Sequence, residues 1–75
     1  MTVQRKQMQQ YAHEYYELGN ASILQAHNLR AALANYDKAL SLDPSHVDAW
    51  IRKGVTLQDH GEYEDALQCF NRAAE

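Results

Sequence analysis

The second half of this chain repeats an apolar pattern of the first half at a constant distance of 34 residues. Five residues recur as themselves or as another member of the same apolar class: Leu29 as Tyr63, Ala32 as Ala66, Leu33 as Leu67, Tyr36 as Phe70 and Ala39 as Ala73. A period of this length is typical of proteins in which one helical unit is copied and stacked. Such units usually offer a surface to a partner, so the period bears on function as well as on fold.

Apolar steps of three and four residues, interrupted by helix-ending residues, predict four helices. They lie at residues 3–26, 29–42, 45–60 and 62–75. Asn28 is a candidate N-cap for the second helix, and Pro44 should end that helix, because proline disfavours helical geometry in the residue before it. Ser45 is expected to cap the third helix in a capping box, and Gly61 to end it. No segment alternates with the period of a strand. The predicted fold is all-α, with two antiparallel helix-turn-helix hairpins stacked together.

The second copy carries a set of residues in a distinctive order and spacing: Trp50, Gly54, Leu57, Gly61, Tyr63, Ala66, Phe70 and Ala73. This set resembles the tetratricopeptide repeat family. The first copy supplies the matching Tyr15, Leu18, Gly19, Ala32, Tyr36, Ala39 and Pro44. The resemblance covers about residues 13–75 and implies a single domain that forms a short solenoid. Repeat 1 is then about 13–46, with a helical extension at 1–12, and repeat 2 is about 47–75, without its C-terminal end or a capping helix.

The chain departs from the family pattern at three places. Gly19 and Gly54 lie 35 residues apart rather than 34, so one extra residue is expected between Gly19 and Leu29, near the first turn. Ala26–His27 stands where the family usually has a helix-ending glycine, and Lys53 stands at a position that is usually apolar. The first turn should therefore differ in shape from the second.

The resemblance also implies a site, because in this family the first helix of each pair lines a concave groove that receives a peptide. The corresponding residues are His13, Tyr16, Asn20 and Ile23 in the first copy, and Asp48, Ile51, Val55 and Gln58 in the second. Their spacing of three, four and three places each set on one helix face. The mixture suits an apolar peptide held by a few hydrogen bonds. The alternative is that Tyr16, Ile51 and Val55 are covered by another helix or by a second subunit.

One subgroup of the family clamps a C-terminal carboxylate with lysine and asparagine on its first helix. Asn20 matches that asparagine, but Tyr16 stands at the lysine position. A carboxylate clamp is therefore not expected from these two repeats alone.

A second hypothesis is that the chain is a structural element that associates with itself, or a fragment of a longer array. The residues expected to leave apolar surface on the last helix are Leu67, Phe70 and Ala74. They could form a symmetric dimer through that helix. Alternatively, Arg5 and Lys6 could meet the acidic residues 62–65 of a second molecule, in a head-to-tail contact.

Composition and charge argue against several other classes. The net charge is −3, whereas nucleic-acid binding requires a basic face. No apolar run approaches the roughly 20 residues of a membrane span. The single Cys69 cannot form an internal disulfide, which favours a reducing compartment and a cytoplasmic location.

Catalytic and metal-binding patterns are lacking in the sequence. The four histidines, His13, His27, His46 and His60, do not have metal-ligand spacing, and no pair stands at i, i+4. There is no glycine-rich phosphate loop and no nucleophile with a partner base. The sequence therefore predicts a protein-binding module that is not an enzyme and has no cofactor or metal.

Overall fold

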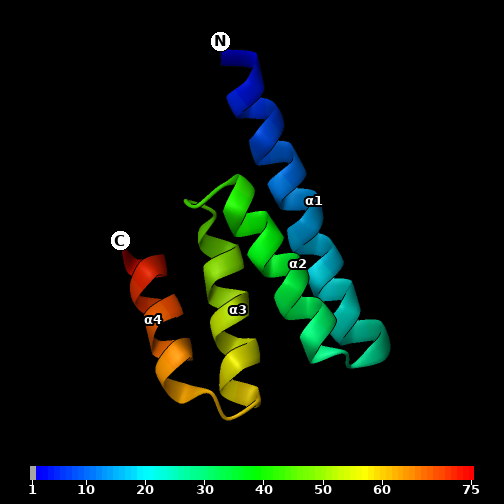
Figure 1. The fold of residues 1–75 in the computed structure, drawn as a ribbon, viewed down its shortest axis with the longest axis vertical. Coiled ribbons are helices and arrows are strands. Elements are labelled where there is room, and N and C mark those ends of the chain that lie inside the picture. Colours follow the sequence, from blue (N-terminus) through cyan, green and yellow to red (C-terminus); the bar gives the residue numbers. More distant parts are fainter. Residues whose placement is uncertain (1) are drawn as a thin grey trace.

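The computed structural model describes the backbone of residues 2–75 and the side chains from residue 4 onward. It has four helices: α1 (Thr2–Ala26), α2 (Leu29–Leu42), α3 (Val47–Asp59) and α4 (Tyr63–Ala74). They lie side by side in chain order, each antiparallel to the next, and the first turns of α1 project beyond the others (Figure 1). No strand occurs within residues 2–75. The predicted all-α fold of stacked hairpins is confirmed.

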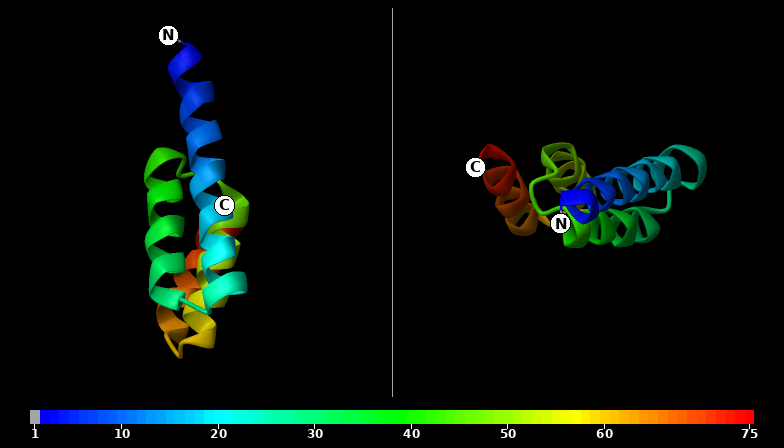
Figure 2. Two further views of the ribbon diagram at one scale, coloured as in Figure 1. Left: turned by 90° about the vertical axis from the view of Figure 1, so that its right-hand side faces the viewer. Right: turned by 90° about the horizontal axis from the view of Figure 1, so that it is seen from above.

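Each helix packs mainly on its neighbours in the chain: α1 on α2, α2 on α3 and α3 on α4. The molecule is a thin layer, with Cα extents of 41 × 29 × 13 Å, as the two views of Figure 2 show. The core therefore lies between successive helices rather than at one centre.

Two buried clusters form much of this core. The first joins both hairpins and consists of Ala12, Ala39, Leu40 and Ala49. The second lies between α3 and α4 of the second hairpin and consists of Leu57, Ala66 and Cys69. Trp50 packs against both clusters, and its indole N–H donates to the Pro44 carbonyl oxygen at 2.7 Å. Trp50 therefore fills space between the two repeats.

Within each hairpin, the two helices approach closely at a glycine. The ring of Tyr36 on α2 lies over Gly19 of α1, and the ring of Phe70 on α4 lies over Gly54 of α3. Each ring therefore packs inside its own hairpin. The bare glycine backbone leaves a hollow on one helix that the aromatic ring of the other helix occupies.

The two hairpin turns show where the extra residue lies. In the second turn, Gly61 has φ +85°, and the Glu62 N–H donates to the Leu57 carbonyl oxygen at 2.8 Å. In the first turn, the equivalent bond runs from the Asn28 N–H to the Ser22 carbonyl oxygen at 3.0 Å. That bond spans one residue more, so the insertion lies between these two groups.

The first turn has no glycine, and a histidine takes the left-handed conformation there. His27 adopts φ +48°, a left-handed conformation that costs a non-glycine residue some free energy. Asn28 then caps α2, because its Oδ1 accepts from the Ala31 N–H at 3.0 Å. The predicted N-cap is confirmed, and the predicted bounds of α2 match those observed.

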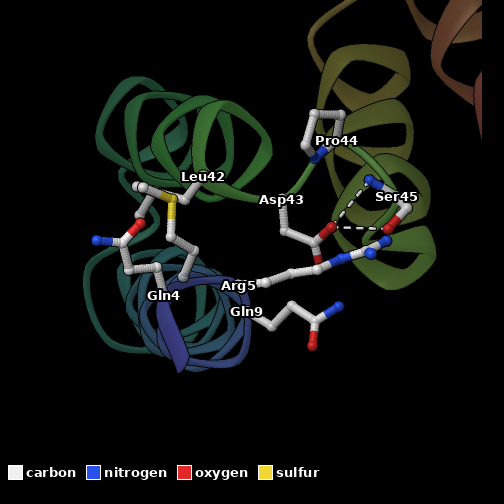
Figure 3. A pocket seen from close by; sticks show the side chains of 8 residues that line it. Gln4, Arg5, Gln9, Leu42, Asp43, Pro44 and Ser45 are labelled. Atoms are coloured by element: carbon white, nitrogen blue, oxygen red, sulfur yellow. Dashed lines mark hydrogen bonds between the residues drawn. The ribbon is translucent and has the colours of Figure 1, made fainter. Parts of the chain in front are cut away.

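The predicted capping box at Ser45 is wrong. Asp43 Oδ1 accepts from both the Ser45 N–H, at 3.1 Å, and the Ser45 hydroxyl, at 2.7 Å, as the dashed lines in Figure 3 show. Ser45 is thereby held in the turn, and α3 begins two residues later than predicted. His46 is its N-cap, since His46 Nδ1 accepts from the Ala49 N–H at 3.1 Å.

The unusual Lys53 links the two hairpins. Its ammonium lies 2.7 Å from Asp37 Oδ1 on α2, and 5.7 Å from the centroid of the Trp50 ring. A charged residue is accommodated at this position because the aliphatic part of its side chain covers apolar surface while its end meets a carboxylate.

Candidate functional site

Most of the side chains expected in the groove are accessible. His13 on α1 and the four α3 residues Asp48, Ile51, Val55 and Gln58 are exposed, and Tyr16, Asn20 and Ile23 on α1 are half-buried. Ile51 is 41% exposed and Val55 40% exposed. These aliphatic side chains are therefore not covered by another part of residues 4–75.

Asn20 has a structural partner that fixes its orientation. The hydroxyl of Tyr36, a fully buried residue, donates to Asn20 Oδ1. The side-chain carbonyl of Asn20 is therefore engaged, and its NH₂ group is the part that remains to meet a ligand. Burial raises the pKa of the Tyr36 hydroxyl, and the positive charge of Arg52 acts in the opposite direction.

An aromatic cluster stands at one end of the candidate groove. The ring centroid of Tyr16 lies 5.5 Å from that of His13, 4.9 Å from that of His46 and 6.1 Å from that of Tyr36. The cluster thus joins α1, α2 and the start of α3. It places the predicted residues His13 and Tyr16 in direct contact.

Sequence reasoning missed His46 as a member of this cluster. His13 Nδ1 and His46 Nε2 are 3.3 Å apart, although the residues are 33 positions apart in the chain. The sequence signal that could have identified His46 was its position, one residue before α3 and two residues before Asp48, which we expected in the groove.

The residues expected to associate differ in their surroundings. Leu67 is 59% exposed and Ala74 is exposed, whereas Phe70 is half-buried against Gly54. Tyr63, one turn before Leu67, is 68% exposed and extends the apolar stripe of α4.

A second apolar stripe lies on the outer face of α1. Met8, Tyr11 and Leu18 are each about half exposed. Tyr11 and Leu18 line a hollow between α1 and α2, together with Glu14, Tyr15, Lys38 and Leu42. This face of α1 points away from the residues assigned to the groove, since it is made by different positions of the helix turn.

A further hollow lies where the first turns of α1 meet the α2–α3 turn (Figure 3). Its lining is Gln4, Arg5, Met8, Gln9, Leu42, Asp43, Pro44 and Ser45. Figure 3 shows the Arg5 side chain reaching toward Asp43 and Ser45. The hollow is open to solvent, and its lining combines polar and apolar groups.

Other kinds of site have little support in the part of the chain that the structure describes. No three His, Cys, Asp or Glu side chains there are arranged around a metal position. Within the same residues, no helix combines the length and hydrophobicity needed to cross a membrane. Cys69 is buried, and burial raises the pKa of its thiol, so less of the reactive thiolate forms.

Comparison with known proteins identifies the repeat. Residues 22–75 match the sequence profile of a family described as "Tetratricopeptide repeat". An uncharacterized protein of Methanocaldococcus jannaschii is 36% identical over 59 residues, which are 79% of this chain and 69% of that protein. Superkiller protein 3 of Schizosaccharomyces pombe is 35% identical over 51 residues, which are 68% of this chain but only 4% of that protein.

Proposed function

Because this chain belongs to the tetratricopeptide repeat family, whose repeats generally mediate protein–protein interaction, we propose that it binds a peptide segment of a partner protein in the groove formed by α1 and α3. The observation that carries the proposal is the exposure of Ile51 and Val55 on α3, the helix whose N-cap His46 contacts His13 and Tyr16 of α1. Apolar side chains on an accessible helix face are suited to burying those of a ligand. We further propose a cytoplasmic setting, in keeping with a lone cysteine.

The chemistry of the groove defines the ligand in outline. Ile51 and Val55 offer apolar contact, and Tyr16 offers a half-buried aromatic ring. The Asn20 NH₂ group offers a donor, which suits a backbone or side-chain oxygen of the peptide. We therefore expect a short apolar segment with an acceptor opposite Asn20, bound without cofactor or catalysis.

The first experiment selects peptides from a random library and measures their affinity for the purified chain by fluorescence anisotropy. Val55→Asn should weaken binding about tenfold or more, since a buried methyl contact is replaced by a polar group. Leu18→Asn is the matched control, because Leu18 is similarly exposed but lies on the outer face of α1. Equal loss in both variants, or no selected peptide at all, would refute the groove.

The role of the Asn20 NH₂ donor is tested more sharply by Asn20→Asp than by Asn20→Ala. Asn20→Ala would also remove the partner of the buried Tyr36 hydroxyl and so destabilise the fold. Asn20→Asp keeps an oxygen for Tyr36 and removes the NH₂ donor. It should keep the melting temperature within a few degrees of wild type while weakening peptide binding. A ligand that binds this variant equally well does not use the Asn20 donor.

A second candidate function is self-association, favoured by the exposed apolar stripe of Tyr63 and Leu67 on α4. The internal α2–α3 contact is a guide to how α4 would stack on α1 of another copy. There, Leu33 packs against the cluster that contains Leu57, and Asp37 pairs with Lys53. The residues at the equivalent positions in a head-to-tail contact are Leu67 against Ser22 and Asn71 against Leu18.

Both of these head-to-tail pairs combine an apolar with a polar side chain, so we favour a symmetric dimer through α4. Light scattering over a range of concentrations tests this. Leu67→Glu should abolish a symmetric dimer, and Leu18→Glu should leave it unchanged. A species that both variants disrupt would indicate head-to-tail stacking, and a monomer at every concentration would exclude either contact.

A further inference from the structure

A chain of polar contacts crosses from α1 to the first turn of α3 at the aromatic end of the groove. The Ala49 N–H donates to His46 Nδ1 at 3.1 Å. His46 Nε2 lies 3.3 Å from His13 Nδ1, and His13 Nε2 lies 3.4 Å from Glu17 Oε1. The two imidazoles thus connect the first helices of both hairpins.

The backbone N–H of Ala49 determines which ring nitrogens of His46 and His13 carry protons in this series of contacts. An amide N–H can only donate, so His46 Nδ1 must be the bare acceptor nitrogen and His46 Nε2 carries the ring proton. That proton is donated to His13 Nδ1, which must also be bare. His13 then carries its proton on Nε2 and donates to the Glu17 carboxylate. Every contact is satisfied when both imidazoles are neutral.

A single added proton breaks this arrangement wherever it goes. On His46 it occupies Nδ1 and removes the acceptor that caps α3. On His13 it occupies Nδ1, so that two donors face each other. The bond between the rings survives only if it reverses, and then the proton of His46 must move to Nδ1, which again removes the cap. A positive charge on His46 would also stand at the positive end of the α3 dipole.

We propose that the His13–His46 pair is a proton-operated latch that holds the first turn of α3 against α1 when both rings are neutral and releases it when either is protonated. This inference rests on the proposed function only in its consequence for the groove. Asp48 and Ile51 lie on the first turns of α3, so release of the latch would loosen that side of the groove. Imidazole changes its charge between about pH 5 and pH 8, within the range of cellular compartments.

Other charged and titratable groups lie on the elements that carry the pair or adjoin it, and of these Tyr16 and Glu17 make direct contact with the two rings. These groups are Glu17 and Tyr16 on α1, Tyr36 on α2, Asp43 in the α2–α3 turn, and Asp48 and Arg52 on α3. None of these groups changes the consequence of protonation, because a proton on the pair breaks either the cap of α3 or the bond between the two rings.

Nuclear magnetic resonance of the full chain tests the latch without any peptide. At pH 8, long-range proton–nitrogen correlations should place the proton of both rings on Nε2. Between pH 8 and pH 5, the hydrogen-exchange protection factor of the Ala49 amide should fall about fivefold, the usual effect of losing an N-cap. Unchanged protection of Ala49 would overturn the proposal, as would His46 or His13 protonated on Nδ1 at pH 8.

His46→Asn supplies the matched control, because asparagine caps a helix as well as any residue and does not titrate. In this variant the protection of Ala49 should no longer depend on pH. The same loss in the variant as in wild type would also overturn the latch. Peptide affinity is measured separately at both values of pH, so failure to bind any peptide would refute the groove while leaving the result for Ala49 intact.

Discussion

The aromatic ring of Tyr36 occupies the space that a side chain on Gly19 would need. A β-carbon added to Gly19 would lie 2.5 Å from Tyr36 Cε1, and one added to Gly54 would lie 2.6 Å from Phe70 Cε1. Both contacts are much shorter than van der Waals distance, and both rings are held within a hairpin. The two repeats therefore depend on the same device, in which an aromatic ring packs on bare helix backbone.

We predict that Gly54→Ala destabilises the protein, although alanine is the better helix former. Overpacking typically costs about 1–3 kcal/mol, whereas the gain in helix propensity is at most about 1 kcal/mol. Chemical denaturation should show a net loss of about 1–2 kcal/mol. The double variant Gly54→Ala, Phe70→Leu should recover part of that loss by relieving the clash. If Gly54→Ala is more stable than wild type, the ring does not lie over this glycine.

We predict that Trp50→Ala costs about 3 kcal/mol, at the lower end of the range for a core aromatic, because Trp50 is only half-buried. The reason for so large a loss is that Trp50 packs against both core clusters and thus joins the hairpins. Trp50→Phe, which keeps a ring but loses the hydrogen bond to Pro44, should cost about 1 kcal/mol beyond the change in size. A melting temperature of Trp50→Ala close to that of wild type would contradict this role.

The helix ends that the sequence predicted correctly are those with a single strong local determinant. Asn28 caps α2 through its own side chain, and Gly61 takes the left-handed conformation that ends α3. Both helix ends depend only on residues that lie within a few positions of each other in the sequence. The repeat period added the hairpin arrangement and located the extra residue near the first turn, since a period carries information between distant segments.

The contacts that could not be predicted from the sequence are of two kinds. Some depend on competition between neighbouring polar groups, and others depend on how distant segments pack together. Ser45 is a good N-cap by type, but Asp43 accepts its hydroxyl and N–H, which leaves the cap to His46. The contact of His13 with His46 depends on how the two hairpins stack, which no helical periodicity specifies. Similarly, the pattern marked Asn20 as a groove residue but gave no sign that its carbonyl is engaged by Tyr36.

We predict that the Cys69 thiol reacts slowly while the protein is folded. Cys69 is only 4% exposed, and burial raises the pKa of its thiol, so both access and thiolate formation are reduced. The rate of labelling by an aromatic disulfide reagent at pH 8 should be at least tenfold below the rate in denaturant, since labelling requires opening of the fold. Trp50→Ala should accelerate it by loosening the cluster around Cys69. Labelling of native wild-type protein at the denatured rate would mean that α4 is not packed on α3.

The last prediction concerns alkaline pH and Tyr36. Burial raises the pKa of its hydroxyl, despite the opposing charge of Arg52, so the folded chain retains a proton that the unfolded chain releases at about pH 10. The folded state then binds more protons than the unfolded state. The contribution of Tyr36 to stability is therefore fully present below that pH and is lost as the pH rises through the raised pKa.

Absorbance at 295 nm should accordingly show that one of the five tyrosines ionises later than the others, together with unfolding. Tyr36→Phe should remove this late phase and make the free energy of unfolding less dependent on pH above about 10. It should also cost about 1 kcal/mol at neutral pH, because the hydroxyl no longer donates to Asn20. Tyr63→Phe is the control, since Tyr63 is 68% exposed and should affect only the early phase. A late phase that persists in Tyr36→Phe would assign the delayed ionisation to another tyrosine.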